Sequence, residues 1–523
     1  MKLFARATLF AAAIFLSAGI LSCPCAQAQT EQITIDASAP AHPFPHFWEQ
    51  MFGSGRAILT LRESYRNDLR AVKSVTDFQY VRFHAILHDE LGVYNEDEHG
   101  NPVYNFDYID QVYDGLLANG VRPVVEISFM PKKLAFNPDW LHPFWYKPNV
   151  SPPKSMERWD DLMRHLAQHL VDRYGIDEVS QWYFEVWNEP NIDFWGGIPR
   201  KESYFDLYAH TARDIKSVSP RLRVGGPATA AAAWIPDFLQ FAAENKVPVD
   251  FVSTHAYADE PVKRLLGTDE VIPTEDRMGA VVAKVRKQID ESPLPHLPLL
   301  WTEWNVTGKD NARETPYVGP AVANVIRECD GKVDYMSFWT FSEVFEEDGP
   351  AHAPFHRFGL RAMGGINKPA FYDFALLHKL GTERLANNSR NALVTRLPDG
   401  SLSIALWNLV DPGDAPHNKQ ITLHTSGVPA DAAVSIERVD ETHGNVMPFY
   451  KAMGSPVSPT AKQVEELNHD TALGPQEQTR LTNGSITLDL GTNALYLLHI
   501  PAEAQAARSR KERHLRAGEV QLK

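Results

Sequence analysis

Short apolar runs alternate with longer amphipathic segments between about residues 46 and 344. The short runs predict β-strands, and the segments whose apolar residues recur every three or four positions predict helices. The clearest helix is expected over 156–174, followed by Gly175, because glycine commonly ends helices. Similar helical patterns cover 106–119 and 275–290. Eight strands are predicted, over 46–53, 80–84, 123–129, 182–187, 222–226, 249–255, 299–303 and 333–341.

Eight strand–helix repeats within about three hundred residues predict an α/β fold, a (β/α)8 TIM barrel over residues 45–350. An open, doubly wound sheet shows the same alternation and is the alternative. The barrel is favoured because polar residues follow many of the strands, whereas a doubly wound sheet gathers its site at one switch point. Gly53-Ser54-Gly55 is a lone glycine turn and does not indicate a phosphate-binding loop.

The pattern of apolar residues changes after about residue 350. The strand-like segments 391–396 and 401–407 flank Pro398-Asp399-Gly400, a turn sequence typical of a hairpin. Such short strands predict an accessory all-β sandwich over residues 351–502. Its further strands are expected over 419–425, 433–439, 485–490 and 494–500.

Four segments stand apart from these two patterns. Residues 30–44 contain a strand-like stretch that could join the sandwich, and the polar, proline-containing segment 449–482 is expected to be a long loop. Residues 503–523 form a charged tail that we expect to be disordered. Residues 1–28 are expected to be a signal peptide.

The signal peptide is inferred from its charge and apolar pattern. Lys2 and Arg6 precede an apolar run over 7–21, and Ala26-Gln27-Ala28 offers a small-residue cleavage site. We therefore expect an exported protein, periplasmic or secreted. A lipoprotein-like anchoring site at Cys23 is the less favoured alternative.

Composition and charge exclude several classes of protein. The 523 residues are 44% hydrophobic and 22% charged, which is ordinary for a globular protein, and the 7–21 run is short for a membrane span. The net charge of −15 argues against a nucleic-acid partner and against attraction to anionic lipid. Cleavage after residue 28 would leave Cys329 as the one cysteine, so we expect no intrachain disulfide and no cysteine-based zinc site.

Two glutamates carry the strongest chemical signal. Glu189 and Glu303 each follow an apolar, tryptophan-containing strand, the fourth and the seventh, and each has an asparagine two positions later. In a parallel barrel the carboxyl ends of the strands meet on one face. A pair of carboxylates on that face is the machinery that hydrolyses glycosidic bonds, with one as proton donor and the other as nucleophile or general base.

Other polar residues are predicted at the same rim of the barrel. Individually each is commonly structural, but together they converge on one face. No spacing typical of metal ligands and no nucleophile elbow appears among them, so we expect neither metal nor cofactor. They are Arg82, His84, His255, Tyr257, Trp339, Glu346 and Glu347.

Six long motifs resemble glycoside hydrolase family 39, in particular its bacterial β-xylosidases. The resemblance covers most of the chain from about residue 45 to residue 500. The motifs are FEVWNEPN, YNFDYID, VPVDFVSTHAY, SPLPHLPLLWTEWN, FWTFSEVFEE and ALWNLV. The resemblance implies a barrel with an appended β-sandwich. It also implies a retaining exo-glycosidase that releases xylose from the non-reducing end of β-1,4-xylo-oligosaccharides by double displacement.

The resemblance assigns a role to each candidate residue. It implies that Glu189 is the general acid/base, that Glu303 is the nucleophile and that Asn188 holds the sugar 2-hydroxyl. It implies that Arg82 lies near the nucleophile and helps to keep it ionised. The resemblance implies that the remaining residues bind substrate. His255 and Tyr257 would do so around the nucleophile. The residues around the non-reducing sugar would be His84, Trp339, Glu346 and Glu347.

Two departures from the family pattern leave alternatives open. Trp304 stands where tyrosine or phenylalanine is expected, and 306–308 lacks an expected tyrosine, which affects the leaving-group side. The alternatives are an α-L-arabinosidase, a β-glucosidase or an α-L-iduronidase-like enzyme, although iduronidases usually have aspartate in place of Asn191. A non-catalytic carbohydrate-binding protein is a further alternative. The sequence alone does not decide between exo and endo action. It also leaves open whether the protein forms a homo-oligomer.

Overall fold

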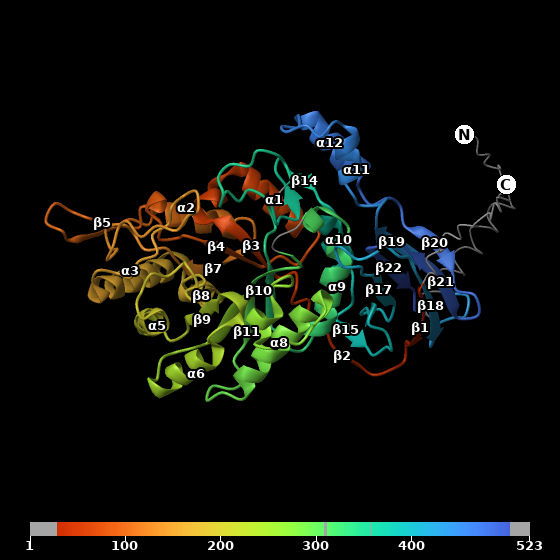
Figure 1. Ribbon diagram of the computed structural model, residues 1–523, viewed down its shortest axis with the longest axis horizontal. Coiled ribbons are helices and arrows are strands. Elements are labelled where there is room, and N and C mark those ends of the chain that lie inside the picture. The colour runs from red at the N-terminus through yellow and green to blue at the C-terminus, as the bar shows by residue number, and fades with distance from the viewer. Residues whose placement is uncertain (1–28, 308–310, 356, 503–523) are drawn as a thin grey trace, which may run out of the picture.

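The computed structural model describes residues 29–307, 311–355 and 357–502. The expected signal peptide and the expected charged tail lie outside these residues. Figure 1 shows a barrel surrounded by helices on one side of the molecule and a set of β-sheets on the other. Within the described residues, no helix combines the length and apolar character needed to cross a bilayer.

Eight strands close into a barrel, which confirms the predicted fold class. All neighbouring pairs run parallel. The first strand begins later than expected because Phe47 and Trp48, although buried, lie in a turn. The strands are β3 (Met51–Arg56), β4 (Tyr80–His84), β7 (Arg122–Ile127), β8 (Tyr183–Val186), β9 (Arg223–Thr229), β10 (Phe251–Tyr257), β11 (Leu299–Asn305) and β12 (Tyr335–Phe338).

Helices connect successive strands and cover the outside of the barrel (Figure 1). The helix expected over 156–174 has these bounds. It begins where the Ser155 hydroxyl accepts a hydrogen bond from the Arg158 amide, and it ends at Gly175, whose φ is 80°. The helices are α1 (Glu63–Lys73), α2 (Asp107–Leu117), α3 (Met156–Tyr174), α4 (Ile176–Val179), α5 (Arg200–Val218), α6 (Ile235–Glu244), α7 (Val262–Leu266), α8 (Thr274–Asp290), α9 (Val318–Cys329) and α10 (Pro369–Leu377).

The barrel interior has an apolar layer beneath a charged one. Successive side chains of a strand point to opposite faces, so residues two apart share the interior. Near the start of the strands an apolar cluster fills the barrel, made of Met51, Tyr80, Val124, Tyr183, Phe251 and Leu300. Two residues further along, the interior holds the fully buried polar side chains of Arg82, Glu126, Glu185 and Thr302. The second layer directly supports the rim where the candidate residues lie.

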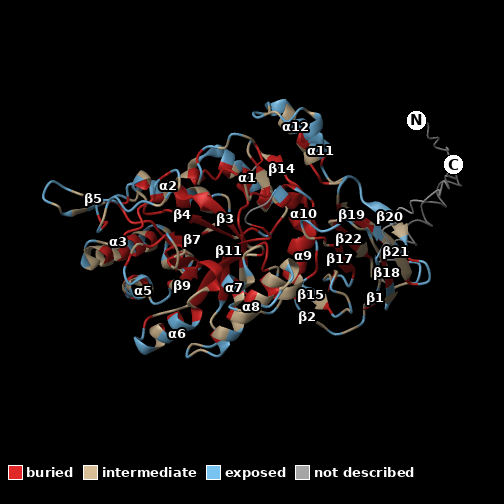
Figure 2. Cartoon of the chain, viewed as in Figure 1, coloured by how far each residue is buried: buried red, intermediate tan, exposed pale blue. Residues whose placement is uncertain are grey.

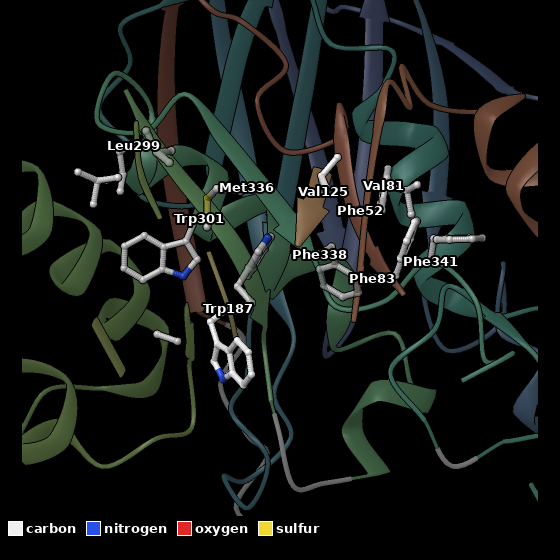
Figure 3. Close-up of a cluster of buried hydrophobic side chains, with 14 of the residues drawn as sticks. Phe52, Val81, Phe83, Val125, Trp187, Leu299, Trp301, Met336, Phe338 and Phe341 are labelled. Atoms are coloured by element: carbon white, nitrogen blue, oxygen red, sulfur yellow. The ribbon is translucent and has the colours of Figure 1, made fainter. Parts of the chain in front are cut away.

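The alternate positions of the strands form the main hydrophobic core. Figure 3 shows part of this core, with Val81 and Phe83 from β4, Val125 from β7 and Trp301 from β11. These side chains belong to one large buried cluster with residues of the surrounding helices. Figure 2 shows the barrel strands and parts of these helices in red, the colour of buried residues. Their burial is the main contribution to the stability of the barrel.

The second part of the molecule contains two sheets around a separate apolar cluster. The expected hairpin is present as β16 and β17, which pair antiparallel. The N-terminal strands join these sheets, since β1 pairs with β18 and β2 pairs with β15. One sheet contains β1 (Gln29–Asp36), β18 (Lys419–Ser426) and β21 (Ser485–Leu490). The other contains β2 (Ala41–Pro43), β15 (Glu383–Leu385), β16 (Ala392–Arg396), β17 (Leu402–Asn408), β22 (Ala494–Ile500), β19 (Ala433–Val439) and β20 (Glu477–Arg480).

The helix α10 joins the two parts. It follows the last barrel strand and packs against α9, and it also contacts β19 and β22 of the larger sheet. The chain therefore continues to pack on the barrel beyond residue 350. Two small antiparallel sheets complete the described strands, β5 (Tyr94–Glu96) with β6 (Pro102–Tyr104) and β13 (Arg361–Ala362) with β14 (Ile366–Asn367).

The expectation of a long loop over 449–482 is wrong. The segment includes most of α11 (Met447–Ala452), all of α12 (Ala461–Asp470) and β20. Helix α12 begins at a capping box, in which the side chains of Thr460 and Gln463 satisfy each other's backbone amides. These two helices project from the sheets and are largely exposed (Figures 1 and 2). Their polar composition reflects this exposure rather than a lack of secondary structure.

Candidate active site

The first candidate glutamate lies in a sharp turn that follows β8. The backbone is left-handed at Trp187 and at Glu189, with φ of 72° and 43°, which is uncommon for residues other than glycine. The turn is held because the Glu189 amide donates to the Ala228 carbonyl at 2.8 Å and the Trp187 indole donates to the Phe194 carbonyl at 2.7 Å. It brings Asn188 and Glu189 to the rim of the barrel.

The structure brings the two candidate glutamates together. One carboxylate oxygen of Glu189, one of Glu303 and a ring nitrogen of His255 all lie within 4.8 Å of one another. Both glutamates line a cavity of about 410 Å³ at the rim. Its lining also includes His84, His142, Phe144, Asn188, Phe194, Tyr257, Asp259, Glu260, Pro261, Arg264, Trp339, Glu347 and Phe358.

Arg82 lies beneath this cavity at the centre of a buried charge network. Its guanidinium donates to Glu185 at 2.6 Å, to Asn188 Oδ1 at 2.8 Å and to Glu303 at 3.2 Å. It also forms an ion pair with Glu126 at 2.9 Å. A fork of this shape can hold several oxygens at fixed angles, which a lysine cannot do. Because Asn188 uses its oxygen to accept from Arg82, its amide nitrogen is the group left to donate to a sugar hydroxyl.

Glu303 is buried but well supplied with hydrogen bonds. Tyr257 donates its hydroxyl to Oε1, and Arg82 donates to Oε2. Burial raises the pKa of Glu303 above its usual value, and the nearby Glu189 adds to this, while Arg82 opposes it. The donors on both oxygens favour the ionised form that a nucleophile needs.

Glu189 is also buried but differs from Glu303 in its hydrogen bonds. Burial raises its pKa to about 7, against the lowering effects of Arg82 and His84. Its Oε1 lies 3.0 Å from Nδ1 of His255. Burial lowers the pKa of His255 to about 4, so this imidazole is neutral at ordinary pH. The two glutamates thus differ as an acid and a nucleophile must. Glu189 can carry a proton near pH 7, whereas hydrogen-bond donors on both oxygens of Glu303 favour its carboxylate form.

The polar side of the cavity is formed by His84 and Glu347. His84 donates through Nδ1 to the Glu126 carboxylate at 2.7 Å. Burial opposes the charge of His84, yet Glu126 raises its pKa overall. Burial raises the pKa of Glu347 to about 8, so Glu347 is a neutral acid near pH 7. Its Oε1 has no hydrogen-bond partner among the described residues. A buried polar atom of this kind at a cavity wall is suited to binding a sugar hydroxyl.

Trp339 supplies the apolar part of the same wall. Its ring lies 4.9 Å from that of His84 between centroids, and 5.9 Å from the Arg82 guanidinium carbon. Asn305 donates to its backbone carbonyl at 2.6 Å, which fixes the chain just after β12. The indole, the imidazole and Glu347 therefore meet at one side of the cavity.

Glu346 does not line the cavity, unlike the other residues expected to contact the sugar at this wall. Its carboxylate pairs with Arg62 and lies 3.4 Å from Arg56. The backbone at Glu346 is left-handed, with φ of 59°, so consecutive side chains of this loop separate. The structure thus places Glu347 at the cavity and Glu346 in an ion-pair cluster behind it.

Several residues of the site were not among the sequence candidates. Glu126 and Glu185 were missed although each is a charged residue between apolar neighbours in a strand, which is an unusual pattern for a core. The cavity residues His142 and Phe194 come from long connections after β7 and β8, and nothing local marks them. Arg264 lies on the short helix α7 and was missed for the same reason.

Two groups of described residues have side chains of the type that bind metals. One is Glu189, His255 and Glu303 at the rim. The other combines His46 and Glu49, just before β3 at the opposite end of the barrel, with His378, just after α10. In both groups the ring nitrogens already face carboxylate oxygens at hydrogen-bond distance.

Known proteins match this chain over most of its length. The sequence model for "Glycosyl hydrolases family 39" matches residues 31–483. A β-xylosidase of Geobacillus stearothermophilus is 40% identical over 476 residues, covering 87% of this chain and 93% of that enzyme. A β-xylosidase of Caldicellulosiruptor saccharolyticus is 35% identical over 472 residues, covering 88% and 96%.

A solved structure agrees with these sequence matches. The crystal structure of a monomeric β-xylosidase from Caulobacter crescentus CB15 superimposes with a TM-score of 0.81 and 32% identity, covering 91% of this chain and 100% of that one. The family match spans the barrel and most of the sheets that follow it, up to residue 483. With a carboxylate pair at the ends of the fourth and seventh barrel strands, this chain belongs to glycosyl hydrolase family 39.

Proposed function

We propose that this protein is a retaining exo-β-xylosidase, which releases xylose from the non-reducing end of β-1,4-xylo-oligosaccharides. The observation that carries the proposal is the approach of the two carboxylates, whose oxygens lie within 4.8 Å of each other. Retaining enzymes hold their carboxyl groups about 5–5.5 Å apart, whereas inverting enzymes leave about 6.5–9.5 Å for a water molecule. The preference for xylose is supported by the two β-xylosidases that match over most of the chain.

In the first step, Glu303 attacks the anomeric carbon while Glu189 gives its proton to the departing glycosidic oxygen. The bond between carbon and this oxygen breaks, and an ester forms between the sugar and Glu303. The raised pKa of Glu189 supports its role as the acid, since this carboxyl still holds a proton near pH 7. The hydrogen bonds from Tyr257 and Arg82 support the role of Glu303 as the nucleophile.

In the second step, Glu189 takes a proton from water while the water oxygen attacks the anomeric carbon. The ester bond breaks and Glu303 leaves as a carboxylate. The proton affinity of Glu189 falls between the two steps, because esterification removes the negative charge of Glu303. Asn188 donates to the 2-hydroxyl, while His84, Trp339 and Glu347 bind the remainder of the same sugar. Two substitutions in succession retain the anomeric configuration.

A panel of nitrophenyl glycosides with product analysis tests this proposal. The β-xyloside should be the best substrate, ahead of the α-L-arabinoside, the β-glucoside and an iduronide. Proton NMR during early turnover should show β-xylose as the first-formed product. Xylotriose should yield xylose and xylobiose, with reducing-end labelling showing removal from the other end. An α-anomer formed first, or a better rate on another glycoside, would contradict the mechanism or the sugar assignment respectively.

We also propose that the protein is exported, because its first 28 residues have the pattern of a signal peptide. Fractionation of the producing cells, with N-terminal sequencing of the active protein, tests this. A cytoplasmic protein that retains Met1 would contradict it.

A further inference from the structure

A chain of hydrogen bonds leads from the charged layer of the barrel to the acid Glu189. Thr302 donates its hydroxyl to Glu185 Oε1 at 2.6 Å. The same hydroxyl oxygen lies 3.2 Å from His255 Nε2, and His255 Nδ1 lies 3.0 Å from Glu189 Oε1. Glu185, Thr302 and His255 are fully buried, so water does not compete for these bonds.

The direction of this chain follows from its first member. Glu185 accepts from Arg82 Nε at 2.6 Å through its other oxygen, so it acts as a carboxylate with two acceptor oxygens. The Thr302 hydroxyl has a single hydrogen, which it gives to Glu185. Toward His255 the hydroxyl can therefore only accept. His255 Nε2 must carry a hydrogen, and the neutral ring then has a lone pair on Nδ1.

The lone pair on Nδ1 faces Glu189. Two acceptors cannot form a hydrogen bond, so the contact at 3.0 Å requires the hydrogen to lie on Glu189. We propose that Glu185 and Thr302 are positioning residues that hold His255 in its Nε2–H tautomer and thereby keep Glu189 in its acid form. This inference rests on the proposed glycosidase function, since it assigns how the acid of that reaction is kept protonated.

The arrangement also has a consequence for the second step. Once Glu189 has given its proton to the leaving group, its carboxylate faces the lone pair of His255. The ionised form lacks a hydrogen bond there and is raised in energy, so it takes a proton from water more readily. One fixed tautomer thus favours both the initial acid form and the return to it.

Other charges also act on Glu189, and they come from every element around it. From β4, Arg82 and His84 favour its ionised form, as does Arg264 of α7, whereas Glu126 of β7 opposes it. Three further carboxyl groups and a hydroxyl interact with Glu189, namely Glu303, Glu260, Glu347 and Tyr257. Replacing Thr302 leaves all of these groups in place, so it isolates the contribution of the tautomer.

The test is the pH dependence of kcat/KM for Thr302→Val, with xylobiose as substrate. Without the hydroxyl, His255 is free to place its hydrogen on Nδ1 and donate it to an ionised Glu189, which lowers the pKa of Glu189. The alkaline limb of the profile should move down by about one pH unit. Thr302→Ser keeps the hydroxyl and should restore the position of this limb. An alkaline limb that stays in place in Thr302→Val, even with a lower rate at every pH, would overturn the proposal.

A matched control is available on the neighbouring strand. Thr254 is also fully buried and donates its hydroxyl to the Thr229 carbonyl at 2.8 Å. Thr254→Val removes a buried hydroxyl of the same kind, and its alkaline limb should coincide with that of the parent protein. An equal shift in both variants would show that the effect comes from disturbed packing, and would also overturn the proposal.

A second measurement does not depend on turnover or on the stability of a variant. Nitrogen NMR of the histidine-labelled parent protein distinguishes protonated from unprotonated ring nitrogens, and His255→Asn assigns the signal. Near pH 6, Nε2 of His255 should carry the hydrogen and Nδ1 should not. A hydrogen on Nδ1 would refute the tautomer. Absence of any glycosidase activity with the expected tautomer present would instead refute the proposed function.

Discussion

Nη1 of Arg82 donates to Oε2 of Glu303 at 3.2 Å, across 221 residues of sequence. Arg82 is fully buried and is also shared by Glu126 and Glu185. Burial opposes its charge, but these carboxylates raise the pKa of Arg82 overall. One cation therefore holds three barrel strands and the candidate nucleophile in a single network.

Substitution of Arg82 should affect both stability and activity. Arg82→Met leaves several buried carboxylates without their cation, and loss of one partner of a buried ion pair typically costs about 3–5 kcal/mol. Arg82→Lys keeps the charge but cannot donate to Glu185, Asn188 and Glu303 at once. We expect a lower melting temperature and little activity for the methionine variant, and a smaller loss of stability with a large loss of kcat for the lysine variant.

Arg122 is the control for this experiment. It also pairs with a glutamate through two nitrogens, Nε and Nη2, but both Arg122 and Glu178 are partly exposed. Such pairs contribute about 0–1 kcal/mol. Arg122→Lys and Arg122→Met should therefore leave the melting temperature and kcat/KM nearly unchanged. A comparable effect at both sites would contradict the view that burial gives Arg82 its importance.

The two glutamates should respond differently to the quality of the leaving group. Glu303→Gln removes the nucleophile and should abolish turnover of every xyloside. Glu189→Ala should lower kcat/KM on xylobiose by about 10²–10⁴-fold, the usual contribution of a general acid. On 2,4-dinitrophenyl β-xyloside the kcat/KM of Glu189→Ala, which reports the first step, should fall much less, because that leaving group departs without a proton. Equal losses on both substrates would argue against the assigned roles.

The pH profile of kcat/KM should be bell-shaped. Glu189 must be protonated to act as the acid, and burial raises its pKa to about 7, so activity should fall as the pH rises through this value. Glu303 must be ionised, and its pKa is also raised by burial and by Glu189. The acidic limb should therefore lie above the ordinary glutamate value of 4.5. The two values belong to the coupled pair, and an alkaline limb below the acidic one would be incompatible with these roles.

The barrel could be predicted because its signals are local. The strands were recognised as short apolar runs. Along a strand, every second side chain points to the same face, and on β4 Val81 and Phe83 lie in the core for this reason. The catalytic candidates could be predicted because parallel strands deliver their carboxyl ends to one face. Glu303 lies on β11 and Glu189 in the short turn directly after β8, so predicting them needed no knowledge of the longer connections.

The remaining features depend on contacts between distant segments. Nothing near Glu346 indicates that Arg56 and Arg62, almost three hundred residues earlier, would pair with it and draw it away from the cavity. By contrast, α12 was missed despite a local signal, since Thr460 and Gln463 have the spacing of a capping box. The polar composition of the segment outweighed that signal in the prediction.

The last prediction concerns the close approach of Gly53 to Trp339. A Cβ atom added at Gly53 would lie 2.2 Å from Cε3 of the Trp339 ring, so only glycine leaves room for the indole at the cavity wall. Gly53→Ala should displace the ring, raise KM for xylobiose and lower kcat/KM by about tenfold or more, at a stability cost of about 1–3 kcal/mol. Gly474→Ala is the control, because a Cβ there meets nothing within 4 Å. Kinetics and thermal unfolding of both variants check this, and a Gly53→Ala enzyme with parental KM would show that the position of Trp339 does not set sugar binding.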